Sequence, residues 1–140
     1  MHKIFLSILI GFICTPLASC DNSTGSVQKL DHNITLNNGE RWEANTATTE
    51  GVQNMIAMMQ SFNELENIEA FTQLSTNLKS EFSLIFKNCT MTGEAHNQLH
   101  NFLIPIKDSF AVLSSSDLPK CQEGYYSLLS HLQEYPVYFK

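Results

Sequence analysis

The stretch Cys-Thr-Met-Thr-Gly-Glu-Ala-His-Asn-Gln-Leu-His, residues 89–100, decides the fold because a turn opens a helix there. Apolar residues recur every three or four positions before it, over residues 65–86, and again after it, over residues 92–113. This spacing is typical of amphipathic helices with one buried face. A short connection between two such helices favours antiparallel packing, so we expect an antiparallel pair joined at this turn.

Two further helices are predicted on either side of this pair. Residues 48–62 show the same spacing, with Thr48 or Thr49 as the capping residue. Residues 118–135 follow the pattern again, and Pro119 suits a first-turn position. Pro105 lies inside the third helix, where it should produce a kink. Four amphipathic helices with short connections predict an all-α, antiparallel up-down four-helix bundle.

The segments outside the helices are shorter. Residues 34–42 predict a short β-hairpin around Asn38-Gly39, because both turn positions tolerate positive φ. An extended lead-in without paired strands is the alternative for this segment. Residues 137–139 are too apolar for a free tail and are predicted to fold back over one end of the bundle.

The beginning of the chain has the features of a secretion signal. A short positive start is followed by an apolar run over residues 4–13, which is too short to span a membrane as a permanent helix. The run leads to Leu17-Ala18-Ser19-Cys20, which resembles the lipobox of bacterial lipoproteins: an aliphatic residue, two small residues and a cysteine. An ordinary secretory signal that ends in a chance cysteine is the alternative.

The lipobox resemblance implies cleavage after residue 19 and fatty acylation of Cys20, palmitate being a typical acyl chain. It implies a signal peptide over residues 1–19, a lipidated flexible tether over residues 20–33, and one helical domain over residues 34–140. The protein would then lie in the cell envelope, anchored to a bacterial membrane by lipid and facing the periplasm or the exterior. Residues 89–100 also resemble segments of small, uncharacterised helical lipoproteins, which implies no activity.

The charge balance excludes one class of partner. The chain has 8 basic and 14 acidic residues, giving a net charge of −6, and the basic residues are scattered singly. Nucleic-acid binding needs a clustered basic face, so we expect no nucleic-acid partner. The acyl chains are the predicted membrane contact, and an envelope protein is a further potential partner.

Two cysteines, Cys89 and Cys121, remain in the predicted domain. An oxidising compartment favours disulfides. In an up-down bundle, however, Cys89 would lie at the end of the second helix and Cys121 at the start of the fourth, at opposite ends of the bundle. A disulfide requires Cα atoms within about 7 Å, so we expect no bridge.

Residues 89–100 also contain the candidate metal ligands. His96 and His100 are four residues apart on one helical face, and helical side chains lean toward the preceding turn. They should therefore approach the turn that holds Cys89, Met91 and Glu94. Thiolate, thioether and imidazole suit copper, whereas thiolate, imidazole and carboxylate suit zinc. Structural roles are the alternative: His96 in the core, His100 in solvent and Glu94 at the helix dipole.

Other cofactors and activities are less well supported by the sequence. Haem held between Met55 or Met59 and a histidine ranks below a metal ion, because there is no C-x-x-C-H attachment motif. No catalytic motif is recognisable, so we expect no enzyme. His32 in the tether and His131 in the fourth helix receive no role. Two functions result: an envelope lipoprotein that binds copper or zinc for sequestration, delivery or sensing, and a metal-free interaction or structural lipoprotein.

Overall fold

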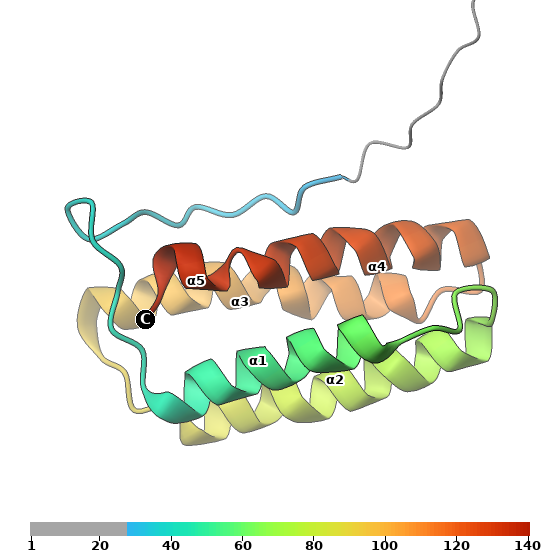
Figure 1. The fold of residues 1–140 in the computed structure, drawn as a ribbon, viewed down its shortest axis with the longest axis horizontal. Helices are drawn as coiled ribbons and strands as arrows, with labels where there is room; N and C mark the ends of the chain where they lie inside the picture. The colour runs from blue at the N-terminus through green and yellow to red at the C-terminus, as the bar shows by residue number, and fades with distance from the viewer. Residues whose placement is uncertain (1–27) are drawn as a thin grey trace, which may run out of the picture.

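The computed structural model describes residues 28–140. Its four long helices are α1 (Thr46–Ser61), α2 (Ile68–Asn88), α3 (Gly93–Leu113) and α4 (Leu118–Gln133), and the short α5 (Tyr135–Tyr138) follows. The long helices pack side by side in up-down order (Figure 1). The predicted all-α four-helix bundle is therefore confirmed. The predicted signal peptide over residues 1–19 and the predicted lipidation site Cys20 lie outside the described residues.

The helix starts follow capping chemistry. The side chain of Asn67 accepts hydrogen bonds from the first-turn backbone of α2, and Asp117 does the same for α4. For α1 the predicted cap is wrong, because the helix begins at Thr46 after Asn45. Thr48 is fully buried inside the first turn, and its hydroxyl donates to the side chain of Asn45.

The four long helices surround one apolar core. Every long helix contributes residues that are no more than 2% exposed, among them Met55, Leu78, Phe102 and Leu128. The helix α3 continues through Pro105 as one element. None of the helices between residues 28 and 140 is both long enough and apolar enough to cross a membrane.

The predicted N-terminal hairpin is reduced to a turn. Asn38 and Gly39 both adopt positive φ, and one antiparallel bridge joins Asn37 to Glu40. Within residues 28–140, β-structure is limited to isolated bridges, and no strand is longer than one residue. Trp42 instead exchanges backbone hydrogen bonds with Tyr138 and Lys140 at 2.7 and 2.9 Å, so the C-terminal segment takes the place of a second strand.

The C-terminal segment folds back onto the bundle, as predicted. Phe139 is only 1% exposed and pairs with Trp42 in a parallel bridge. Cys89 and Cys121 are both free thiols, which confirms the absence of a bridge between them. Cys121 is a core residue whose thiol donates to backbone carbonyls near the end of α3.

The segment before α1 runs along α3 and α4 (Figure 1). Leu30 packs against the core, Ile34 is 8% exposed, and Asn101 of α3 donates to the carbonyl of Asn33. Residues 28–33, which belong to the range predicted as tether, thus lie against the helices. The alternation of Leu30, His32 and Ile34 places all three on the face of an extended segment that meets the bundle.

Candidate functional site

The corner between α2 and α3 brings sulfur and nitrogen donors together. Cys89 directly follows α2 and Thr92 directly precedes α3, and both have an extended backbone conformation. Gly93 has a φ of +65°, a conformation that glycine adopts without steric cost, and it turns the chain into α3. His96 and His100 then occupy the first two turns of α3.

Cys89, His96 and His100 form a row with His96 in the middle. The sulfur of Cys89 lies 3.6 Å from Nδ1 of His96, and Nε2 of His96 lies 3.0 Å from Nε2 of His100. The two rings are 4.4 Å apart between centroids. Two nitrogens at hydrogen-bond distance must share one proton, because two N–H groups facing each other would repel.

These three side chains line a small cavity of about 70 Å³. Apolar residues of both helices, Ile85 and Leu99, form part of its wall. The aromatic ring of Phe86 meets His100 edge-on at 5.7 Å. The donors are therefore half-buried beside hydrocarbon, where water competes less strongly for a bound ion.

The other two predicted ligands do not join this row. The carboxylate of Glu94 accepts hydrogen bonds from Gln98 at 2.7 Å and from Asn97 at 3.1 Å, and these bonds lower the pKa of Glu94. Met91 is half-buried against the core and is not part of the cavity lining. The geometry thus gathers Cys89, His96 and His100 from the predicted set.

A second cluster of titratable groups joins the segment before α1 to the end of α4. His32, His131 and Glu134 can each offer a ligand atom so that the three atoms lie within 4.8 Å of one another. Nε2 of His32 lies 2.8 Å from Oε2 of Glu134, and Nε2 of His131 lies 2.8 Å from the carbonyl of Phe102. The two imidazoles meet edge-on with centroids 5.1 Å apart.

The environment of this cluster shifts two pKa values. Burial lowers the pKa of His131, although the hydrogen bond to the Phe102 carbonyl opposes the shift. For Glu134, burial acts to raise the pKa, but hydrogen bonds from His32 and Lys29 outweigh it and lower the pKa. The neutral imidazole of His131 and the ionised carboxylate of Glu134 are therefore the favoured forms.

The sequence predicts no role for His32 or His131, although the residues around each of them indicate that it is buried. His131 follows Leu128 by three residues and precedes Leu132 on the apolar stripe of α4, so a buried imidazole could be expected there. His32 alternates with the apolar residues Leu30 and Ile34, a period-two pattern typical of an extended segment with one covered face.

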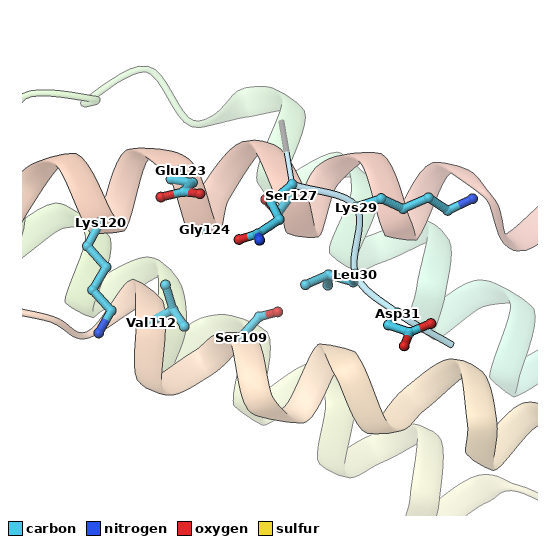
Figure 2. Close-up of a pocket in the computed structure, with 10 residues that line it drawn as sticks. Lys29, Leu30, Asp31, Ser109, Val112, Lys120, Glu123, Gly124 and Ser127 are labelled. Carbon is cyan, nitrogen blue, oxygen red and sulfur yellow. The ribbon is translucent and has the colours of Figure 1, made fainter. Parts of the chain in front are cut away.

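A larger groove lies between residues 28–31, α3 and α4 (Figure 2). Its volume is about 320 Å³. Figure 2 shows Leu30 directed into the space between the two helices, whereas Lys29 extends along α4. Charged residues of both signs, including Asp31, Lys120 and Glu123, surround the groove, so it has no strong preference for an ion of either sign.

Comparison of the chain with protein-family models, with curated proteins and with solved structures finds no match in any of the three.

Proposed function

We propose that this protein is a lipid-anchored lipoprotein of the bacterial cell envelope whose helical bundle binds copper or zinc at the α2–α3 corner. The observation that carries the proposal is the 3.0 Å separation between Nε2 of His96 and Nε2 of His100. Two imidazole nitrogens on one tetrahedral zinc ion, with Zn–N of about 2.0–2.1 Å, lie roughly 3.3 Å apart. The pair is therefore close to the spacing that a shared metal ion requires.

Cys89 supplies the next donor. Its sulfur contacts Nδ1 of His96, the nitrogen that does not face His100. In that position the thiolate accepts the second N–H of His96 and fixes the ring, a role that outer ligands commonly have around metal-bound histidines. A movement of the sulfur toward the Nε2 pair would convert it into a direct ligand, and a thiolate ligand would favour copper(I).

The lipid anchor rests on the lipobox-like sequence at Leu17–Cys20. With the anchor at the membrane and the corner on the bundle, the protein would hold a metal ion at the envelope surface for sequestration, delivery or sensing. No catalytic role is proposed: Cys89 and His96 resemble a thiol nucleophile with its base, but no oxyanion site is recognisable beside them in the described part of the chain.

The experiment is a titration of the full chain, purified in detergent under reducing conditions, with copper(I) and separately with zinc. We expect one equivalent to bind tightly at this corner and the double substitution His96→Ala/His100→Ala to remove that equivalent, whatever the rest of the chain binds. The matched control is His32→Ala, which removes an imidazole elsewhere and should leave the equivalent bound at the α2–α3 corner unchanged. Equal affinity in wild type and double variant would overturn the proposal.

Cys89→Ser separates the two roles of the sulfur. If Cys89 is a direct ligand, cobalt(II) bound at this corner shows a sulfur-to-metal charge-transfer band that disappears in Cys89→Ser. If it only orients His96, the band is absent in the wild type and the substitution weakens binding by about 10- to 100-fold.

A second candidate is a metal-free interaction module. The observation that favours it is the exposure of large apolar side chains on α2 and α3, among them Phe86 at 46% and Ile104 at 55%. Exposed apolar groups that cluster are typical of protein contact surfaces. The same titration decides between the candidates, because copper and zinc binding that does not change in His96→Ala/His100→Ala leaves only this one.

A further inference from the structure

We propose that His32, His131 and Glu134 form a second metal site, suited to zinc, that joins the segment before α1 to the end of α4. These residues are separate from Cys89, His96 and His100, so the proposal does not depend on the function proposed above. His32 is about 100 residues away from His131 and Glu134 in the sequence and meets them only in the folded bundle.

Two buried nitrogens of this cluster have no partner. Nδ1 of His32 and Nδ1 of His131 are the side-chain atoms that are buried without a hydrogen bond in the part of the chain that the structure describes. Buried polar groups in proteins are almost always hydrogen-bonded, so an orphaned atom calls for an explanation. A metal ion between the two rings supplies one.

The protonation of the two rings leaves both of these nitrogens able to bind a cation. A carbonyl oxygen only accepts hydrogen bonds, so Nε2 of His131 must donate to Phe102, which leaves the lone pair of Nδ1 free. In the same way, the ionised carboxylate of Glu134 accepts from Nε2 of His32, and Nδ1 of His32 is left free. Histidines that bind metals typically donate their second N–H to a carbonyl or a carboxylate.

The ligand types indicate which metal the cluster would bind. Two imidazole nitrogens and, once it turns from Nε2 of His32 to the ion, a carboxylate oxygen of Glu134 form a zinc ligand set, and three protein ligands leave one position for water. The cluster contains no sulfur, which makes a soft ion such as copper(I) less suitable. The side chain of His32 is only 5% exposed, but that of Glu134 is 22% exposed, so an ion can enter from the Glu134 side.

The positive charge of Lys29 should weaken metal binding at this cluster, and this effect can be tested by substitution. Its ammonium group lies 3.0 Å from Oε1 of Glu134 and competes with a cation for that carboxylate. The lysine side chain is 67% exposed, so its effect is moderate. Replacing it by glutamine should therefore tighten zinc binding about two- to fivefold at low salt, as expected for loss of an exposed charge interaction.

The test is a zinc titration of the full chain in detergent, in the His96→Gln/His100→Gln background, which isolates this site. We expect one equivalent of zinc to bind, and His32→Gln to weaken that binding by at least about tenfold. His32 lies on the segment before α1, so its replacement leaves the helices in place; circular dichroism checks this. Cobalt(II) in the same site should show tetrahedral visible bands without a sulfur charge-transfer band.

Three results would overturn the second site: no zinc binding in the isolating background, an affinity that does not change in His32→Gln, or a cobalt spectrum with sulfur ligation. An affinity that is weaker, rather than tighter, in Lys29→Gln would also contradict the assignment. Failure of the corner site leaves this titration unaffected, since the isolating background already lacks His96 and His100. The two proposals therefore stand or fall separately.

Discussion

The hydroxyl of Tyr125 in α4 donates a 2.7 Å hydrogen bond to the backbone carbonyl of Met59 near the end of α1. Carbonyls in the last turn of a helix have no partner from the helix itself. The same carbonyl accepts a 3.2 Å bond from the backbone of Phe62, so Tyr125 provides its shorter partner. This buried bond joins the first and last long helices of the bundle.

Removal of that hydroxyl should destabilise the bundle without changing its fold. Tyr125→Phe keeps the aromatic ring and loses one buried hydrogen bond, so we expect the free energy of unfolding to fall by about 0.5–1.5 kcal/mol. Urea denaturation followed by circular dichroism measures the change. Tyr126→Phe is the matched control: Tyr126 is 44% exposed, and its substitution should have no measurable effect. A larger loss in the control would contradict the role assigned to Tyr125.

The close approach of α3 and α4 depends on a glycine. A Cβ atom at Gly124 would lie 2.5 Å from Cγ1 of Val112, which is closer than packed carbon atoms allow. Alanine normally stabilises a helix relative to glycine by about 1 kcal/mol. Here we expect the opposite sign, a destabilisation of about 1–3 kcal/mol from overpacking.

The contact with Val112 makes this second prediction specific. Because the methyl groups of Val112 cause the overlap, Val112→Ala should rescue Gly124→Ala, and the double variant should unfold at a higher urea concentration than the Gly124→Ala single variant. Thermal or urea unfolding of the four proteins of this cycle measures the coupling. Strictly additive effects would show that the two positions do not touch.

The two free thiols should differ in reactivity. Cys121 is fully buried, and burial raises the pKa of its thiol, which suppresses the reactive thiolate. Cys89 is half-buried at the α2–α3 corner. A thiol reagent added to the native protein should therefore modify Cys89, whereas Cys121 should react only in denaturant. Mass spectrometry of non-reduced digests should find no peptide that links the two, and Cys89→Ser should abolish native labelling within residues 28–140.

The sequence was sufficient for the bundle because apolar periodicity is a property of each helix by itself. The stripes around Phe71, Leu103 and Leu128 predicted the helices without tertiary information, and the turn at residues 89–92 followed from them. Helix ends were harder to predict. The helix α1 begins at Thr46 after Asn45, and not after Thr48 or Thr49, because Thr48 is buried inside its first turn. The hairpin prediction failed because Trp42 pairs with the C-terminal segment, which is far away in the sequence, and not with a neighbouring strand.

The candidate sites show the same division between local and long-range information. The contact between His96 and His100 is set by a four-residue spacing, and the sequence alone predicts it. The cluster of His32 and His131 depends on where an extended segment lies on a helix about 100 residues later. No local pattern specifies that meeting, although the positions of both histidines among apolar neighbours indicate that each is covered.

The stability of the metal-free protein should depend on pH through His131. Burial lowers the pKa of His131 in the folded state, whereas the unfolded chain keeps the ordinary value of 6.5. Below that value the unfolded state binds a proton that the folded state does not, so the free energy of unfolding should fall as the pH falls from 7 toward 5. One proton limits the slope to about 1.4 kcal/mol per pH unit.

The titratable groups around His131 determine the pH range in which this prediction can be measured. His32 lies against its ring, with Glu134 and Lys29 beyond, and Tyr138 contacts His32 from α5. The lowered pKa of Glu134 adds a stabilisation that is present above pH 4.5 and is lost below it, so measurements from pH 5 to 7.5 exclude the titration of Glu134. Urea denaturation of the wild type and of His131→Gln, with a chelator present, gives the slope of the free energy of unfolding against pH for each protein.

The amide of His131→Gln can still donate to the Phe102 carbonyl. This variant should be less stable than the wild type at pH 7.5, and its stability should depend less on pH. Equal slopes would show that His131 takes up its proton as readily in the folded state as in the unfolded one.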